Sequence, residues 1–397
     1  MVNGDPDTTV ILSTARTPIG RFNGSLATKT APQLAGHAIK AALERAGLTG
    51  EQVSQVLLGQ VLSAGVGQNP ARQAAIAGGI PMQVPSLSIN KVCLSGLTTI
   101  GMADSLLRGG AADVIVAGGM ESMSRAPHLL PGSRTGHKYG DAVMLDHLAF
   151  DGLTDAYDNI SMGESTEHHL AGSSITRADQ DSFAAASHQR AAKAADKLAG
   201  EIAPIEVPAG RKETRTMDAD EGIRADATAE GLGKLRPAFT KDGTITAASA
   251  SQISDGAAAL VLTTKRNAEA KGWSYVGEIL SYATVAGPDN GLLHQPSNAI
   301  ASALENTDHT VADLDVIEIN EAFAAVALAS AADLNLDLDQ VNPNGGAIAL
   351  GHPIGASGAR LPITLLTELA SRGGGIGAAA LCGGGGQGDA LIVRAAQ

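Results

Sequence analysis

An internal repeat restricts the folds that this 397-residue chain can adopt. The apolar run that ends at Leu58 resembles the run that ends at Ile319, 261 positions later. The pair Ser95-Gly96 resembles Ser357-Gly358, 262 positions later, and each pair opens a segment with helical spacing of apolar residues. Matches at nearly one offset indicate two copies of one structural unit.

Each copy continues through glycines into a strand of small residues, at 112–119 and at 376–383. The second copy turns at once into a last strand, residues 388–393, which predicts a hairpin. In the first copy the counterpart of that strand, residues 254–262, comes only after a long insertion. Apolar strands that alternate with amphipathic helices, twice over, predict an α/β fold in which helices cover mixed sheets.

We therefore divide the chain into two core halves and an inserted domain. The first half comprises residues 1–122 and 251–272, the inserted domain residues 123–250, and the second half residues 273–397. The insertion contains a basic cluster, which is either a solvated face or a site for an anionic ligand. Its members are Arg211, Lys212, Arg215, Arg224, Lys234 and Arg236.

Composition excludes several classes of protein. The net charge of −13 argues against general binding to nucleic acid or to an anionic membrane, because both favour basic proteins. The first residues lack the pattern of a signal peptide, and no apolar run is long enough to span a bilayer. Two cysteines in separate glycine-rich motifs suggest free thiols, although their spacing alone does not exclude a disulfide. We expect a cytoplasmic protein.

Cys93 lies where an apolar strand pattern ending at Ile89 gives way to a helical pattern starting at Leu94. A helix N-terminus stabilises a thiolate, so this position predicts a pKa below the free-thiol value of about 8.5. The alternative is a small buried hydrophobe, the commoner role of a lone cysteine. The junction favours a nucleophile.

His352 and Cys382 also lie among small residues. His352 is enclosed by Gly351 and Gly355, which leave room for a ligand beside the imidazole, although most of the 10 histidines must be structural. Cys382 ends an apolar strand and precedes four glycines, whose backbone N–H groups are natural oxyanion donors. The alternative for Cys382 is a filler in a tight hairpin.

Asn320 and Glu321 end a buried strand before a probable helix. A polar pair at that position needs partners or a ligand. Capping of the helix by Asn320 is the alternative, and capping does not exclude a catalytic role.

Together these motifs resemble the thiolases, specifically the acetyl-CoA C-acetyltransferases of the biosynthetic type. Four blocks carry the resemblance: Cys93, Asn320-Glu-Ala-Phe323, Gly351-His-Pro-Ile-Gly355 and Cys382-Gly-Gly-Gly-Gly-Gln-Gly388. It extends almost from end to end and includes residues 14–20 and 118–128. It implies a duplicated βαβαβαββ core in an α/β/α/β/α arrangement with an inserted loop domain, assembled as a homotetramer.

The resemblance implies reversible Claisen condensation of two acetyl-CoA molecules to acetoacetyl-CoA and CoA, by a ping-pong route. Cys93 would carry the acyl group, and Cys382 would move the α-proton of the second acetyl-CoA. His352 would activate Cys93 and bind the thioester oxygen, with a water held by Asn320. The N–H groups of Cys93 and Gly384 would form a second oxyanion hole. No metal, nucleotide or flavin cofactor is implied.

The resemblance also implies the contacts of coenzyme A, which the inserted domain would mainly supply. Arg224 would lie near the adenine, and the other expected contacts are Leu153, Met162, Phe239, Ser251 and Phe323. Three positions depart from the usual pattern of the family, namely Ser161, Gln252 and Ser254. We expect these departures to affect substrate preference more than activity.

Other functions remain open at the level of sequence. The nearest is a degradative 3-ketoacyl-CoA thiolase for longer or branched chains, decided by loops around residues 123–147. Ketoacyl-carrier-protein synthases pair their cysteine with two histidines, whereas this chain offers Cys, His and Cys. A papain-like hydrolase also uses Cys, His and Asn but has no use for Cys382. A non-catalytic CoA-binding protein is the last alternative.

Overall fold

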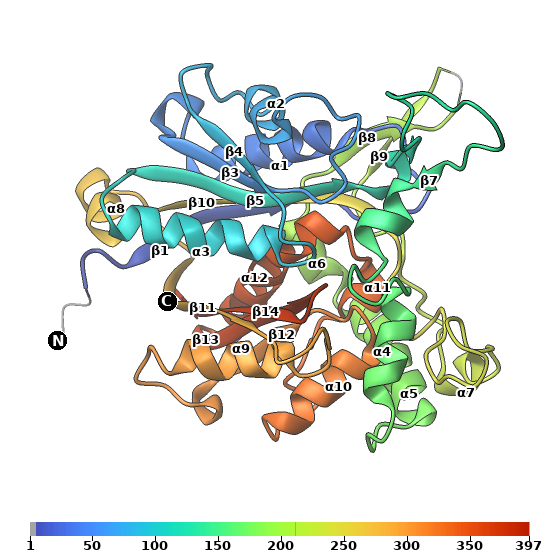
Figure 1. The fold of residues 1–397 in the computed structure, drawn as a ribbon. Coiled ribbons are helices and arrows are strands. Elements are labelled where there is room, and N and C mark those ends of the chain that lie inside the picture. The colour runs from blue at the N-terminus through green and yellow to red at the C-terminus, as the bar shows by residue number, and fades with distance from the viewer. Residues whose placement is uncertain (1–4, 211, 397) are drawn as a thin grey trace.

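The computed structural model describes residues 5–210 and 212–396 and consists of five alternating layers of helices and strands (Figure 1). The first half contributes β1 (Thr9–Arg16), β2 (Gly20–Arg21), β3 (Gln55–Gly59), β4 (Ser86–Ile89), β5 (Val114–Ser122), β10 (Ser254–Thr264), α1 (Ala31–Ala46), α2 (Pro70–Ala77), α3 (Ser95–Arg108) and α8 (Lys265–Lys271). The second half contributes β11 (Gly277–Ala286), β12 (Val316–Ile319), β13 (Gly375–Gly383), β14 (Gln387–Ala395), α9 (Gln295–Leu304), α10 (Ala324–Asp333), α11 (Ala347–Leu350) and α12 (Ile354–Ser371).

Strand pairing repeats between the halves. In the first half β3 runs parallel to β5, β5 antiparallel to β10, and β10 antiparallel to β1. In the second half β12, β13, β14 and β11 follow in the same order with the same directions. The two sets join between β1 and β11 through only two residue pairs, Val10 with Glu278 and Ile11 with Gly277. The predicted duplication and the predicted hairpin of β13 and β14 are confirmed.

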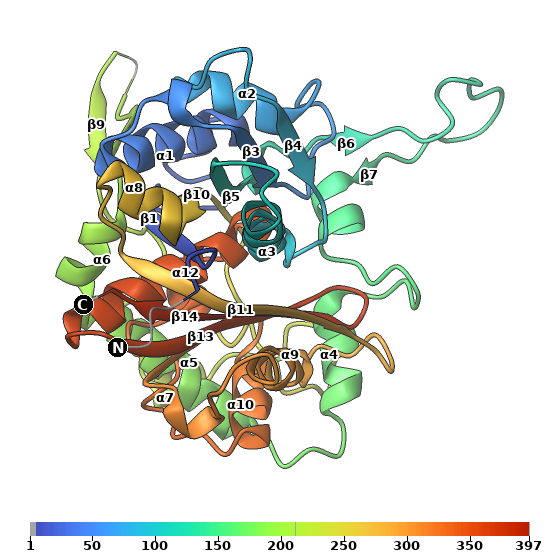
Figure 2. The same ribbon diagram turned by 90° about the vertical axis from the view of Figure 1, so that its left-hand side faces the viewer.

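Helices occupy three layers around these strands. Helices α1 and α2 cover the first half, whereas α9 and α10 cover the second. Helices α3 and α12 lie between the two sets of strands, where α12 packs against α3, β5, β10 and β13 (Figure 2). The small aliphatic side chains of this central layer are fully buried, so the predicted α/β/α/β/α arrangement is confirmed.

The central helices approach closely at two glycines. A Cβ atom on Gly358 would lie 2.4 Å from the backbone nitrogen of Leu97, and one on Gly96 would lie 2.7 Å from that of Ala359. Real Cβ atoms do not approach backbone so closely, so only glycine allows this crossing. The matching Ser-Gly pairs of the repeat are therefore the point where its two copies meet.

We expect Gly358→Ala to lower the free energy of unfolding by about 1–3 kcal/mol, because the added methyl group would push the central helices apart. Urea denaturation followed by circular dichroism measures this. The control is Gly200→Ala, in an exposed helical position where a Cβ meets no atom within 4 Å. Equal stability of the two variants would contradict the close approach.

The inserted segment forms a mixed region beside the core. Its elements are β6 (His128–Leu129), β7 (Leu145–Asp146), a π-helical turn (Leu148–Gly152), α4 (Met162–Leu170), α5 (Arg177–Lys193), α6 (Ala195–Glu201), β8 (Ile205–Pro208), β9 (Thr214–Met217) and α7 (Ala229–Leu232). Buried Arg16 of β1 anchors it, with its Nε 2.7 Å from Glu201 Oε2 and its Nη1 2.7 Å from Asp220 Oδ1. The exact domain boundaries stay a prediction.

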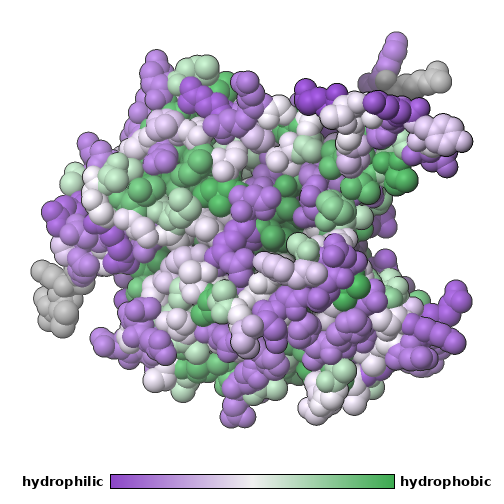
Figure 3. All heavy atoms as spheres, viewed as in Figure 1, coloured by the Kyte–Doolittle hydropathy of each residue, from purple (hydrophilic) through white to green (hydrophobic). Residues whose placement is uncertain are grey.

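Figure 3 shows hydrophilic residues spread over one face, with hydrophobic residues visible among them. None of the described helices combines the length and apolarity needed to cross a bilayer.

Candidate active site

Three loops from the two halves bring the sequence-predicted residues together. Cys93 lies between β4 and α3, which agrees with the predicted strand-to-helix junction. His352 lies in the loop between α11 and α12, and Asn320 directly follows β12. Cys382 stands near the end of β13. Because α3 and α12 cross at Gly96 and Gly358, the loops that precede these helices are held side by side.

Equivalent serines support the two loops. The backbone N–H of Lys91 donates to Ser95 Oγ at 2.8 Å, and this hydroxyl donates to the carbonyl of Val92 at 2.6 Å. Val92 itself has a φ of 51°, a strained value for a β-branched residue, directly before Cys93. In the second copy Ser357 takes the place of Ser95.

Ser357 determines which nitrogen of His352 carries the proton. Its Oγ donates to the carbonyl of Pro353 at 3.1 Å and lies 2.6 Å from His352 Nδ1. A hydroxyl that donates elsewhere can only accept from the imidazole, so Nδ1 carries hydrogen and Nε2 holds a free electron pair. Burial, aided by the positive charge of Arg360, lowers the pKa of His352 to about 3. The imidazole is therefore neutral, with Nε2 available as a base.

The environment of Cys93 overturns one expectation. Burial raises the pKa of its thiol to about 12, although the N–H groups of Cys93 and Gly384 favour the thiolate. Nearby Glu121 adds to the increase. The predicted lowering by the helix N-terminus is wrong for the free protein, because removal of water outweighs the backbone dipoles. The proton of Cys93 must therefore leave during the reaction, to a base such as His352.

The pH dependence of alkylation tests this. Iodoacetamide reacts with the thiolate, so the rate at Cys93 should rise about tenfold per pH unit through neutral pH, as expected below a pKa of about 12. A free thiol levels off near its pKa of about 8.5. Peptide mapping assigns the label, with Cys93→Ser as the blank. If the alkylation rate instead levelled off below pH 8.5, the helix N-terminus would lower the pKa of Cys93 after all.

Cys382 is buried and lies near Cys93. Burial raises the pKa of its thiol well above the usual range, and the charge of a Cys93 thiolate raises it further. The turn that follows contains Gly385 and Gly386 with φ values of 81° and 66°. A Cβ on Gly386 would lie 1.8 Å from the carbonyl oxygen of Asp289, so the turn needs glycine there. This turn brings the N–H of Gly384 to the Cys93 thiol.

Asn320 faces the imidazole and caps no helix. Helix α10 begins later, with Phe323 at the N-cap position, so the capping alternative is wrong. Asn320 Nδ2 lies 3.4 Å from His352 Nε2, and Oδ1 is buried with no hydrogen-bond partner among the described residues. The neighbouring Glu321 accepts hydrogen bonds from Ser187, Asn342 and the N–H of Ile348. Glu321 therefore fixes the backbone, whereas Asn320 is free to act on a ligand.

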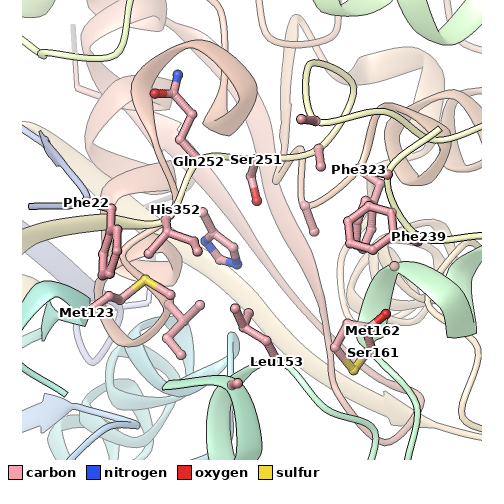
Figure 4. Close-up of a pocket in the computed structure, with 18 of the residues that line it drawn as sticks. Phe22, Met123, Leu153, Ser161, Met162, Phe239, Ser251, Gln252, Phe323 and His352 are labelled. Atoms are coloured by element: carbon pink, nitrogen blue, oxygen red, sulfur yellow. The ribbon is translucent and has the colours of Figure 1, made fainter. Parts of the chain in front are cut away.

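A cavity of about 540 Å³ opens beside His352 (Figure 4). Apolar side chains dominate its lining, and His352 points into it between Met123 and Phe323. The lining contains five of the residues expected to contact coenzyme A: Leu153, Met162, Phe239, Ser251 and Phe323. Cys93, Cys382, Asn320 and Gly384 are not among the lining residues, but Cys93 packs against the cluster of Met123 and Ile354, and Cys382 against that of Phe323.

Arg224 does not line the cavity. Its side chain is exposed, and its backbone N–H donates to His188 Nδ1 at 3.2 Å. A second surface hollow, lined by Arg236 and Lys241, shares Ala247 with the cavity. The other described members of the basic cluster are exposed, and Arg211 lies outside the described residues. Arg21 lines the cavity itself, and Arg236 and Lys241 line the adjoining hollow.

The departures at Gln252 and Ser254 support the His352 backbone. The N–H of His352 is shared by the carbonyl of Gln252, at 3.0 Å, and Ser254 Oγ, at 3.2 Å. The side-chain amide of Gln252 donates to the carbonyls of Gly222 and Ile348, at 3.1 and 2.9 Å. Ser161 caps α4 and lines the cavity.

Sequence reasoning missed two buried residues. Ser357 had been used only as a marker of the repeat, and its contact with His352 could have been suspected from its position one turn into a helix. Glu121 accepts hydrogen bonds from the N–H groups of Val61, Leu62 and Gly355, at 2.9, 3.1 and 3.0 Å. Nothing in the sequence alone places Glu121 and the N–H of Gly355 beside those of Val61 and Leu62.

Comparisons with known proteins agree with this arrangement. The family model "Thiolase, N-terminal domain" matches residues 9–266, and "Thiolase, C-terminal domain" matches residues 273–395. A probable acetyl-CoA acetyltransferase of Mycolicibacterium smegmatis is 55% identical over 97% of this chain and 100% of its own. An acetyl-CoA acetyltransferase of Cupriavidus necator is 49% identical over 97% and 98%. The crystal structure of the Bacillus anthracis acetyl-CoA acetyltransferase has a TM-score of 0.94 and 39% identity, covering 98% and 99%.

Proposed function

Because the chain belongs to the thiolase family, we propose that it is an acetyl-CoA C-acetyltransferase, which condenses two acetyl-CoA molecules reversibly into acetoacetyl-CoA and CoA. One observation supports this most: a neutral histidine with a free Nε2 lies at a substrate-sized apolar cavity, and one free cysteine from each copy of the fold packs against residues that line it. A reaction that transfers an acyl group and also moves a C–H proton needs both thiols.

The first half-reaction transfers the acetyl group to Cys93. His352 Nε2 takes the thiol proton while the sulfur attacks the thioester carbon, and the C–S bond to CoA breaks. The departing CoA sulfur takes a proton from Cys382. The oxygen of the tetrahedral intermediate is stabilised by preorganised donors in a dry site, which the N–H groups of Cys93 and Gly384 are proposed to supply. Acetyl-Cys93, protonated His352 and a Cys382 thiolate remain.

The second half-reaction forms the carbon–carbon bond. The Cys382 thiolate removes the α-proton of a second acetyl-CoA, whose enolate oxygen lies against protonated His352 and a water held by Asn320. The α-carbon attacks the carbonyl of acetyl-Cys93. As acetoacetyl-CoA forms, the Cys93 sulfur leaves and recovers its proton from His352. Both thiols and the imidazole are then in their starting states.

The cavity is proposed to hold the pantetheine arm of coenzyme A. Leu153, Met162, Phe239 and Phe323 supply apolar contact, and Ser251 supplies a hydrogen-bonding group. The phosphates would lie near the adjoining hollow with Arg236 and Lys241, and the adenine near Arg224. A local basic rim of this kind suits a polyanionic ligand on an acidic protein.

Incubation with acetyl-CoA tests the proposal directly. Intact-protein mass and peptide mapping should reveal one acetyl group on Cys93, and the same preparation should cleave acetoacetyl-CoA only when CoA is present. Cys93→Ser is the control and should remain unmodified at this position. Absence of the adduct, with CoA binding retained, would favour a non-catalytic CoA-binding protein.

We further propose that the enzyme works without a cofactor, as a homotetramer in the cytoplasm. Dialysis against a chelator should leave acetoacetyl-CoA cleavage unchanged. Sedimentation at enzyme concentrations used for assays should give four times the chain mass of 40.0 kDa. A stable monomer with full activity would contradict the assembly.

A further inference from the structure

A small apolar cluster lies against Cys93 and extends away from the cavity. Its buried members are Val61, Leu62, Met123, Leu148 and Ile354. Met123 and Ile354 also line the cavity, whereas Val61, Leu62 and Leu148 do not. The cluster therefore forms a wall, with its front facing the cavity and its back buried in the protein.

Cys93 contacts only two apolar clusters among the described residues, and one of them is closed to substrate. The larger is the central core around α3 and α12, whose members are at most 4% exposed. The smaller is the wall. Of these two directions, only the one toward the wall is open to an alkyl chain attached to the sulfur of Cys93 that is to be shielded from water.

The backbone of Leu62 is held at both its N–H and its carbonyl. Its N–H donates to Glu121 Oε1 at 3.1 Å, and its carbonyl accepts from Gln60 Nε2 at 3.1 Å. Glu121 Oε2 also accepts from Val61 and from Gly355 of the His352 loop, so one carboxylate fixes the wall and that loop together. The N–H of Ala64 donates to His147 Nε2 at 3.3 Å, which fixes the far end of the segment.

The side chain of Leu62 leaves no spare room. A Cβ on Gly152 of the π-helical turn would lie 3.3 Å from Leu62 Cδ2 and 3.2 Å from Ile354 Cδ1. Leu62 itself is 2% exposed. A packed side chain on a backbone held at both N–H and carbonyl cannot retreat to admit a longer acyl chain.

We infer that Leu62, held in place through Glu121, closes the acyl end of the site and restricts the acyl group on Cys93 to short chains. The inference rests on the proposed function and adds to it the substrate range. It assigns that range to the loop after β3 (residues 60–64), outside the 123–147 region that sequence reasoning favoured. Removal of the Leu62 side chain should lengthen the accepted chain.

The experiment compares acylation of Cys93 by acetyl-CoA and by hexanoyl-CoA, followed by intact-protein mass over time. Wild type should react much faster with acetyl-CoA. In Leu62→Ala the ratio of the two rates should shift toward hexanoyl-CoA by about tenfold or more, because each methylene in such a pocket changes the rate about 10- to 200-fold. Leu62→Met, which conserves volume, should keep the wild-type ratio.

Leu43→Ala is the matched control for loss of a buried leucine. Leu43 lies in α1, in a separate cluster, and is 4% exposed. If Leu62→Ala does not fold, as judged by circular dichroism, Leu148→Ala tests the same wall. An unchanged ratio in the folded variant, or equal rates in wild type, would overturn the inference. Absence of any acetyl adduct in wild type would instead overturn the proposed function.

Discussion

Cys382→Ser lowers the rate of acetoacetyl-CoA synthesis by about 10²–10⁴-fold. Acetyl-Cys93 still forms from acetyl-CoA, but more slowly, because the departing CoA sulfur has lost its proton donor. This is the expected result if Cys382 moves the α-proton, since general acid–base groups contribute rate factors of that size. Serine nearly conserves the volume of cysteine in this buried position, so the strand β13 should remain intact. The hydroxyl is a far weaker acid, and its alkoxide does not form at neutral pH.

The measurement separates the two half-reactions. Mass spectrometry follows acetylation of Cys93, and a coupled assay follows condensation in the same preparation. Exchange of deuterium from solvent into the methyl group of acetyl-CoA reports the α-proton step alone, and it should disappear in Cys382→Ser. If Cys382→Ser condensed acetyl-CoA at the wild-type rate, Cys382 would serve only to fill space in the hairpin.

His352→Ala should slow both half-reactions, with acetylation of Cys93 reduced by about 10²–10⁴-fold. Burial raises the pKa of the Cys93 thiol to about 12, so without a base nearly all of the thiol stays protonated at neutral pH. The pKa of His352 is lowered to about 3, so the imidazole loses its basic form only below that pH. As the pH is lowered, the acetylation rate of wild type should therefore begin to fall only far below pH 6.5, the pKa of an ordinary histidine.

Ser357→Ala tests whether the hydroxyl of Ser357 positions the imidazole of His352 as a base. Without the hydroxyl, Nδ1–H of His352 has lost its acceptor and the ring can adopt the other tautomer or rotate. We expect acetylation to slow by about tenfold with little change in KM, because the hydroxyl lies outside the cavity lining. Ser105→Ala, at an exposed serine on α3 whose hydroxyl donates to the carbonyl of Gly101, is the control for loss of a helical serine hydroxyl. A loss equal to that of His352→Ala would point to misfolding of the loop.

The fold could be predicted because it depends on a repeated pattern. The matches at Ser95-Gly96 and Ser357-Gly358 are sequence facts, and the structure explains them as the closest approach of two equivalent helices. Cys93 and His352 precede these helices at comparable positions. Their proximity thus follows from the duplication, once the two copies are known to face each other.

Properties that depend on distant groups could not be predicted. The pKa of Cys93 reflects removal of water by elements from both halves, which outweighs the local helix terminus. Asn320 was a credible helix cap until the structure put the first turn of α10 after Phe323. Glu121 accepts from the N–H groups of Val61 and Leu62 after β3 and from that of Gly355 in α12, and no local sequence pattern predicts this contact.

The crossing of α3 and α12 places the chemistry on the boundary between the two copies. Cys93, the proposed nucleophile, belongs to one copy, whereas His352, the proposed base, belongs to the other together with Cys382 and Asn320. Backbone pairing between the two sets of strands amounts to two residue pairs, so the boundary depends on side-chain packing at the central helices. Heating that loosens this packing would separate nucleophile from base while each set of strands keeps its hydrogen bonds. Catalysis is therefore the first property that such a molecule loses, and secondary structure the last.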